Sequence, residues 1–437
     1  MDIFNNILWW VNIVVIIIVA STFIFQLIFM AFFWLKGKKY PETDNYHKFT
    51  FAIRACNEED VIADSVDSCL KVDYPKDKLQ VVVFAHNCKD RTAEIARAHG
   101  ARVVEINDPD PTHRKPSYCI KGGLDKLKLD PQGTHEYILF LDADMQVHKD
   151  YVKECNKAAD SGVVLGRTFE NSRNLSNNMI SCMSGLWYIR DNFFACRARN
   201  AMGLGCVMNG GCSMLKAEYG FNWDAMSSSD DIEFTIKRMY KDKQKVDYID
   251  NAIAYEDQPE TIKDVFNRNT RMGNGLNKLF WTDGMKLLQC FFLNLFNPKM
   301  KFSFKMAMLD QYLNLASIPI AFLAVAWFPV YYIYTLIWVG LTGPLVIYGL
   351  GSFTLLWFIL FIVIVVAAAF FVPFFLQPLI SYLCVKKRLV IKNQSVVTRS
   401  IIFFPCFMLI SAWAVIQGIL TNSKWKKVKR SKTKIEQ

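Results

Sequence analysis

The sequence contains no charged residue between Ile3 and Leu35. That stretch exceeds the roughly 20 residues that an α-helix needs to cross a bilayer, which argues against a core helix of a soluble protein. It also lacks the positively charged amino end, short apolar core and small-residue cleavage site of a signal peptide. We therefore expect a transmembrane helix within residues 1–39. Lys36, Lys38 and Lys39 follow the apolar stretch, so the next segment should be cytoplasmic.

Charge is also scarce in two later blocks, at about 308–384 and 401–420, and 52% of all residues are hydrophobic. This clustering of apolar residues at the two ends indicates an integral membrane protein. Basic stretches follow at 386–392 and 424–430. If both face the cytoplasm, 401–420 must be re-entrant or hairpin-like around Pro405; otherwise the block before Lys386 holds three spans. We expect four or five spans, with an interfacial amphipathic segment at 281–307, a transmembrane region at 308–423 and a basic tail at 424–437.

The twelve cysteines show no paired spacing typical of a zinc site. Most lie in the part expected to be cytoplasmic, where disulfides are unfavourable. The net charge of +11 is concentrated beside the apolar blocks. Orientation and contact with anionic lipid explain this charge better than nucleic-acid binding does. We therefore expect membrane lipid as a partner and no nucleic acid.

Between residues 40 and 280, short apolar runs alternate with amphipathic stretches. Strand-like runs occupy 48–55, 79–86 and 101–106, and helical spacing occupies 58–72 and 91–100. This alternation predicts a parallel sheet with helices on both faces. Ligands bind at the carboxyl ends of the strands in such sheets. Asn57, Asn87 and the Asp142–Asp144 turn fall at these ends and are expected to share one crevice.

The run "ILFLDADMQVHKDYV" ends its apolar part on Asp142 and Asp144. Aspartate is common in turns, so this pair has an ordinary structural reading. The alternative is a metal clamp, because Mg²⁺ or Mn²⁺ commonly binds one or two carboxylates together with substrate phosphates.

Two downstream stretches also allow two readings. In "SSSDDIEF", Asp230 and Asp231 precede an amphipathic stretch, and helix capping is favoured there over a general base on this stretch alone. In "RNTRM", Arg268 and Arg271 lie at helical spacing. They would either bind a diphosphate or form a basic surface beside the membrane.

Taken in order, these stretches resemble the processive branch of the family 2 inverting glycosyltransferases, the group of cellulose, hyaluronan, chitin and poly-N-acetylglucosamine synthases. The resemblance covers about residues 49–275, and the flanking apolar segments suit that group. It implies an α/β fold in which a cytoplasmic, Rossmann-like domain of the GT-A type at 40–280 binds a nucleotide-sugar between transmembrane α-helices.

The resemblance assigns the donor side. The family's Asn-Glu-Glu turn matches "IRACNEED", which places Asn57 and Glu58 at the donor. The family's second strand ends in Asp-Asn, whereas this chain has "AHNCKDRTAEIAR", so His86 replaces the uracil-side aspartate. Lys115 in "HRKPSYC" would meet phosphate.

The catalytic assignments follow from two more motifs. The family's Asp-x-Asp falls on Asp142, nearer the nucleoside, and Asp144, which would bind Mg²⁺ or Mn²⁺. Its Thr-Glu-Asp motif falls on Ser229, Asp230 and Asp231, which makes Asp231 the general base.

The family's Gln/Arg-x-x-Arg-Trp motif falls on "RNTRM". Arg268 and Arg271 keep their places at the donor, and Met272 replaces the tryptophan that lies near the acceptor end in relatives. The acceptor side would also include Gly210, Gly211 and Cys212 of "GCVMNGGCSML" and Asp230.

Three functions remain open at this point. The first is a metal-dependent, multi-pass transferase of the cell membrane that takes sugar from a nucleotide-sugar, expected to be a UDP-sugar, and extends a glycan, with or without an accessory subunit. The second is transfer of a single sugar to a lipid-linked acceptor. The third is a non-catalytic membrane scaffold, which His86 and Met272 favour and the intact carboxylates and Arg271 oppose.

Overall fold

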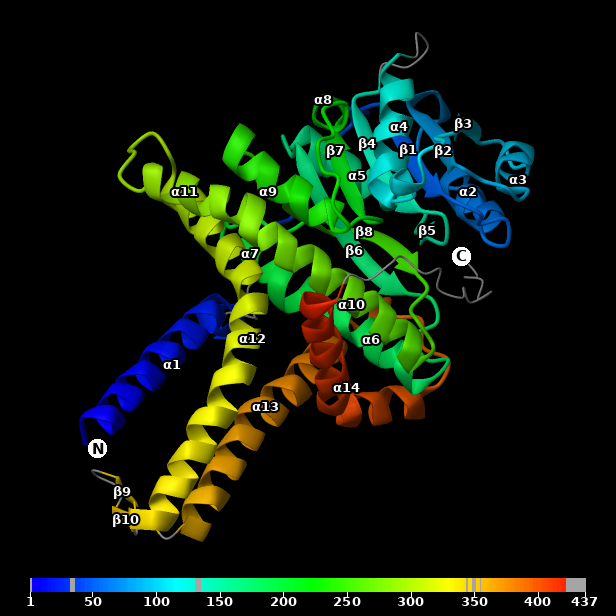
Figure 1. The fold of residues 1–437 in the computed structure, drawn as a ribbon. Coiled ribbons are helices and arrows are strands. Elements are labelled where there is room, and N and C mark those ends of the chain that lie inside the picture. The colour runs from blue at the N-terminus through cyan, green and yellow to red at the C-terminus, as the bar shows by residue number, and fades with distance from the viewer. Residues whose placement is uncertain are drawn as a thin grey trace.

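A mixed sheet of eight strands forms the centre of the protein, in the order β3-β2-β1-β4-β7-β6-β8-β5 (Figure 1). The computed structural model describes residues 2–31, 36–129, 135–342, 345–347, 351–353 and 355–421. The tail predicted at 424–437 lies outside the described residues.

Four neighbouring strands are parallel, as the alternation of apolar runs predicted. They are β1 (Phe49–Ala55), β2 (Leu79–His86), β3 (Arg102–Ile106) and β4 (Tyr137–Asp142). The apolar stretches of β1, β2 and β4 are buried on both faces, which explains why they read as continuous apolar runs. The carboxyl ends of these strands meet at one edge of the sheet.

The other half of the sheet departs from the predicted parallel order. Strand β7 (Ser213–Lys216) runs antiparallel to both β4 and β6 (Leu165–Ser172). Strand β8 (Asp247–Glu256) is parallel to β6, and the short β5 (Gln146–Val147) is antiparallel to β8. The predicted parallel sheet is therefore confirmed for β1 to β4 but not for the strands beyond them. Strand β7 is short and lies far from β4 in the chain, so no local pattern indicates its antiparallel pairing.

Helices cover both faces of the sheet, as predicted. On one face lie α2 (Ile62–Leu70), α3 (Thr92–Ala98) and α5 (Tyr151–Asp160). On the other lie α4 (Pro116–Lys128), α6 (Met179–Arg190) and α9 (Asp230–Asp242). Two separate hydrophobic cores result, one on each side of the sheet.

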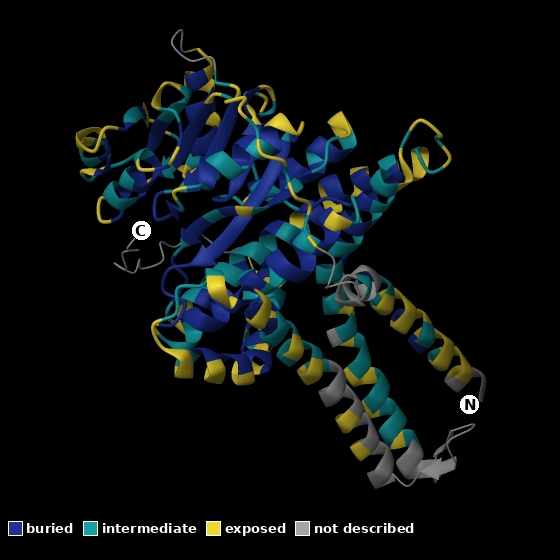
Figure 2. Cartoon of the chain, turned by 180° about the vertical axis from the view of Figure 1, so that it is seen from behind, coloured by how far each residue is buried: buried dark blue, intermediate teal, exposed yellow. Residues whose placement is uncertain are grey.

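Three long helices project from this body: α1 (Asp2–Ala31), α12 (Phe302–Thr342) and α13 (Leu355–Val385) (Figure 1). Most described residues of these three helices are exposed or half-buried, whereas those of the central sheet are mostly buried (Figure 2). A buried ion pair between Arg199 and Asp310, at 2.7 Å, fixes α12 to the body. Among the described residues, two helices are long and apolar enough to cross a membrane, within Phe302–Trp338 and Gln394–Leu420.

Helix α14 (Gln394–Leu420) is continuous, with Pro405 inside it. The chain does not reverse there, so a hairpin around Pro405 is excluded. One side of α14 packs on α6 and on α10 (Ile262–Leu279). The short remaining elements are α7 (Ala198–Ala201), α8 (Ala217–Gly220), α11 (Met285–Leu293), β9 (Leu345–Ile347) and β10 (Gly351–Phe353).

Glycines allow α10 and α14 to cross closely. A Cβ on Gly418 would overlap the carbonyl oxygen of Thr270, and one on Gly273 would overlap that of Val415. The side-chain amide of Asn274 donates to the carbonyl of Gly418 at 3.1 Å. The helix that carries the arginine pair is thus fixed by a segment far away in the chain.

Replacement of Gly418 by valine should separate these helices and lower stability by about 1–3 kcal/mol, as overpacking does. Thermal unfolding of the purified protein in nanodiscs measures this. The control is Cys406→Val on the exposed side of α14. Equal melting temperatures for both variants would contradict the close crossing.

Candidate active site

Two asparagines turn the chain at the carboxyl ends of β1 and β2. Asn57 and Asn87 have φ angles of 56° and 49°, a left-handed conformation that asparagine tolerates better than most residues. The side-chain oxygen of Asn57 accepts from the backbone N–H of Lys89 at 2.7 Å, and that of Asn87 from Asp108 at 2.8 Å. These hydrogen bonds join the turns that follow β1, β2 and β3 at one edge of the sheet.

Arg54 lies at the centre of this edge. It is the Cα partner of Asp142 across β1 and β4. Its Nε donates to Asp142 Oδ1, and its Nη2 donates to Oδ2 at 3.0 Å. Its Nη1 lies 3.9 Å from Asp230 Oδ2. Sequence reasoning missed Arg54, although a lone arginine within a buried apolar strand was the available signal.

Asp230 and Asp231 begin α9, as the motif predicted, but not as simple caps. Ser229 precedes the helix and makes no side-chain capping hydrogen bond. Asp231 Oδ1 accepts from the N–H of Ile232 at 2.8 Å, and its Oδ2 accepts from the N–H of Gly210 at 3.0 Å. The second bond reaches outside the helix, so Ser229 capping does not account for this stretch.

Both carboxyls have raised pKa values. Burial raises the pKa of Asp230 to about 7; Asp231 and Asp142 add to the rise and Arg54 opposes it. Burial also raises the pKa of Asp231, and its hydrogen bonds from Ile232 and Gly210 and the charge of Arg54 oppose this. Asp230 is buried and Asp231 half-buried. Both carboxyls therefore have a raised proton affinity, and Asp231 is the more accessible of the two.

The glycine turn at 209–212 packs directly on this cluster. A Cβ on Gly210 would overlap the guanidinium of Arg54, and one on Gly211 would overlap the sulfur of Met145. Cys212 is fully buried behind the turn. Only glycine at both positions lets the backbone approach Arg54 and Asp142 this closely.

The two arginines of α10 have different environments. Burial and the charge of Arg54 lower the pKa of Arg271, while Asp142 and Asp230 oppose this, so Arg271 adjoins the same cluster. Arg268 instead donates from Nη1 to Gln258 at 2.9 Å, and its guanidinium lies 5.4 Å from the ring of Tyr188. Met272 is half-buried on the same helix.

The predicted donor residues upstream lie at the same edge. His86 ends β2 and is buried, and this burial lowers its pKa. Lys115 is exposed directly before α4. Glu58 is buried, and its N–H donates to Thr92 at 2.8 Å.

Asp144 is 1% exposed. Arg173 donates to its backbone oxygen at 2.7 Å and pairs with Asp257 at 2.9 Å, which holds the Asp-x-Asp turn in place. Within the part of the chain that the structure describes, no three His, Cys, Asp or Glu residues are grouped as metal ligands. A single carboxylate such as Asp144 is of the kind that Mg²⁺ or Mn²⁺ binds together with substrate phosphates and water.

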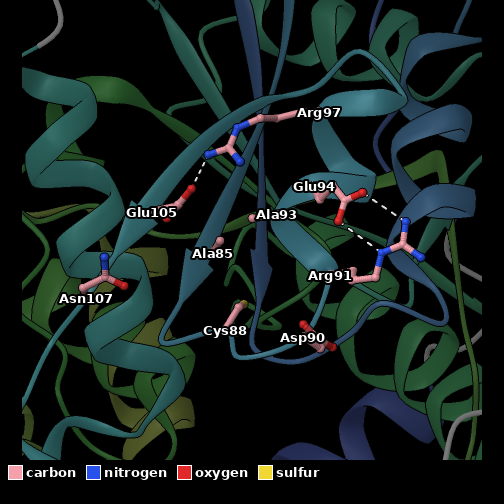
Figure 3. Close-up of a pocket in the computed structure, with 9 residues that line it drawn as sticks. All are labelled: Ala85, Cys88, Asp90, Arg91, Ala93, Glu94, Arg97, Glu105 and Asn107. Carbon is pink, nitrogen blue, oxygen red and sulfur yellow. Dashed lines mark hydrogen bonds and ion pairs between the residues drawn. The ribbon is translucent and has the colours of Figure 1, made fainter.

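A hollow of about 260 Å³ lies beside this edge, between α3 and the ends of β2 and β3 (Figure 3). Its lining residues form two ion pairs, Arg91 with Glu94 and Arg97 with Glu105. None of the predicted site residues lines it. The hollow is thus on the α3 side of the sheet, separate from the Arg54 cluster.

Several known proteins are similar to this chain in sequence. The chain is 22% identical over 295 residues to a poly-beta-1,6-N-acetyl-D-glucosamine synthase of Staphylococcus epidermidis, covering 61% of the chain and 67% of the relative. It is 24% identical to the probable glycosyltransferase YdaM of Bacillus subtilis, covering 52% of the chain and 55% of that protein. A Methanococcus voltae dolichyl N-acetyl-alpha-D-glucosaminyl phosphate glycosyltransferase is 24% identical over 32% of the chain and 47% of its own length.

In structure, the chain resembles a mannosyltransferase, PcManGT from Pyrobaculum calidifontis, solved with GDP-Man and Mn²⁺. The TM-score is 0.52 at 16% identity, covering 91% of this chain and 96% of that one. This likeness shows a shared mixed α/β glycosyltransferase fold. The sequence profile described as glycosyltransferase like family 2 matches residues 47–275, which include Arg54, both aspartate motifs and the arginine pair. The chain belongs to the glycosyltransferase-like family 2.

Proposed function

We propose that this protein is a membrane-bound, inverting glycosyltransferase that transfers sugar from a nucleotide-sugar, expected to be a UDP-sugar, to a growing glycan. The observation that carries the proposal is the cluster around Arg54 of β1, where Asp142, Asp230, Asp231 and Arg271 come together from three other elements. A helix cap or a basic surface patch would not require such a convergence.

The donor would lie along the carboxyl edge of the parallel strands. Asn57, Glu58, His86 and Lys115 would contact the nucleotide part, and Asp142 would lie nearer the nucleoside. Asp144 would hold Mg²⁺ or Mn²⁺, which when bound offsets the charge of the diphosphate. The complex of the structurally similar mannosyltransferase PcManGT with GDP-Man and Mn²⁺ supports this assignment by analogy.

In the reaction, Asp231 would take the proton of an acceptor hydroxyl. That oxygen forms a bond to the anomeric carbon as the bond from this carbon to the diphosphate oxygen breaks, so configuration inverts. Arg271 would stabilise the charge that grows on the departing diphosphate. Gly210, Gly211, Cys212, Asp230 and Met272 would form the acceptor side.

The membrane arrangement is part of the proposal. We assign a transmembrane helix to 1–39, the cytoplasmic catalytic domain to 40–280, the interfacial segment to 281–307 and a membrane region to 308–423. A hydrogen bond from Trp327 to Asn12, at 3.2 Å, joins the first and the later long helices and supports one bundle. Because α14 packs on α10 and α6, we propose that it lies at the membrane surface and does not span. This leaves α1, α12 and α13 as spans, fewer than the four or five expected from the sequence.

Transfer to a lipid-linked acceptor is the second candidate, favoured by the dolichyl phosphate enzyme among the relatives. Purified protein in nanodiscs, incubated with a panel of nucleotide-sugars and Mn²⁺ or Mg²⁺, separates the two. A ladder of product masses supports glycan extension, and a single added sugar supports the lipid acceptor. No product with any donor would oppose both.

Turnover should require a divalent cation, because Asp144 is itself an anion and cannot offset the charge of a diphosphate. EDTA should abolish product formation, and Mn²⁺ or Mg²⁺ should restore it. Isothermal titration of UDP with and without the cation gives a second readout. Activity that survives exhaustive chelation would remove Asp144 from this role.

Asp231→Asn should lower turnover by about 10² or more, as loss of a general base does. Affinity for UDP should stay near that of the wild type.

Because the pKa of Asp231 is raised, the turnover of the wild-type protein should already decline on acidification at a pH above the ordinary aspartate pKa of about 3.9. Asp242→Asn, at the other end of α9, is the matched control. Substantial turnover in Asp231→Asn would reject the base.

Arg271→Lys should lose most activity although its charge is kept, because lysine does not replace the planar fork of arginine. Arg268→Gln should be tolerated with a modest loss, since Arg268 contacts Gln258 and Tyr188 instead. Initial rates at saturating donor measure both. The reverse order would indicate a surface that responds to charge alone.

A further inference from the structure

Glu170 is a fully buried carboxyl that the proposed reaction does not use. It lies on β6 with 0% of its surface exposed, and its Oε2 accepts a hydrogen bond from the side-chain amide of Asn209. Burial raises the pKa of Glu170 well above its usual value, and the adjoining carboxyl of Glu256 adds to this. A protonated Glu170 keeps one oxygen as acceptor and gains an O–H donor.

Asn209 connects this carboxyl to the proposed base. Its carbonyl accepts from the N–H of Cys212 at 3.1 Å, which closes the 209–212 turn. The next residue, Gly210, donates its N–H to Asp231 at 3.0 Å. The position of the Asn209 side chain therefore sets where the Gly210 donor points.

A second branch leads from Glu170 to the arginine helix. Gln258 donates from Nε2 to Glu256 at 3.3 Å and accepts from Arg268 Nη1 at 2.9 Å. Arg268 thus contributes to the same polar cluster, on the side away from the base.

We propose that Glu170 is a positioning residue that, through Asn209, holds the Gly210 N–H against the general base Asp231. The inference rests on the proposed role of Asp231. A hydrogen bond to an ionised carboxylate favours the charged form, which is the form that accepts a proton. Burial raises the pKa of Asp231, and the Gly210 hydrogen bond is one of the contacts that oppose this rise.

The other charges that face Asp231 come from Arg54 on β1 and Arg167 on β6. Asp142 on β4 acts on the adjoining Asp230. Arg54 and Arg167 have ion-pair partners of their own, in Asp142 and Asp191. A change in the proton affinity of Asp231 after mutation of Asn209 therefore reports the Gly210 hydrogen bond.

The test compares Glu170→Ala, Asn209→Ala and Glu170→Gln in the full chain in nanodiscs. Both alanine variants should lower turnover at neutral pH about tenfold or more, and the acid limb of their pH profile should move upward by about one pH unit. Glu170→Gln should keep the wild-type profile, because its amide oxygen accepts the same hydrogen bond. Affinity for UDP should be unchanged in all three.

The matched control is Asn200→Ala. Asn200 is buried, and its side chain exchanges hydrogen bonds with the backbone of Tyr248 at 3.2 and 3.1 Å, away from Asp231. Its loss should lower the melting temperature without moving the acid limb. An unmoved acid limb in both test alanine variants, or Glu170→Gln as impaired as Glu170→Ala, would overturn the proposal. If Asp231→Asn retains turnover, the base assignment itself fails, which is a different result.

Discussion

The pairing of Arg54 with Asp142 is the constraint on which the site depends. The two residues face each other across neighbouring parallel strands, so the register of β1 and β4 alone brings them together. The Arg54 side chain is only 14% exposed. Removing one partner from a buried ion pair costs about 3–5 kcal/mol, because the other charge is left in a medium that solvates it poorly.

Every other part of the site is arranged around that cation. The glycine turn approaches it from one side, Asp230 from another, and Arg271 lies within reach of its charge. A guanidinium can serve several such neighbours because its donors lie in a rigid plane and point in different directions. The site is thus organised before any substrate binds, which reduces the cost of orienting the reacting groups.

The same arrangement separates the roles of two adjacent carboxyls. Asp230 is buried against Arg54, whereas Asp231 is half-buried and accepts two backbone N–H groups. Burial raises the pKa of Asp230 to about 7 and also raises the pKa of Asp231. The polar cluster of Glu170, Glu256 and Gln258 reaches Arg268 on α10, and α10 in turn packs closely on α14.

Much of the framework could be predicted from the sequence. The strands at 79–86 and 101–106, the helix ending near Gly100, and the placement of Asn57, Asn87 and Asp142 at strand ends follow from local patterns of apolar residues. Such patterns depend on neighbours within a few residues, which is why they are visible in the chain itself. The family also follows from its motifs in order, and the profile match bears this out.

The tertiary structure decided what depends on residues distant in sequence. Only the folded chain places Arg54 between Asp142 and Asp230 and the Gly210 N–H beside Asp231. Only in the fold does β7 pair antiparallel between β4 and β6. It also separated the surroundings of Arg268 and Arg271, which helical spacing had placed on one side. The physical reason is that burial, hydrogen bonding and charge at these positions come from segments that meet only after the chain has folded, and no local pattern records which segments those are.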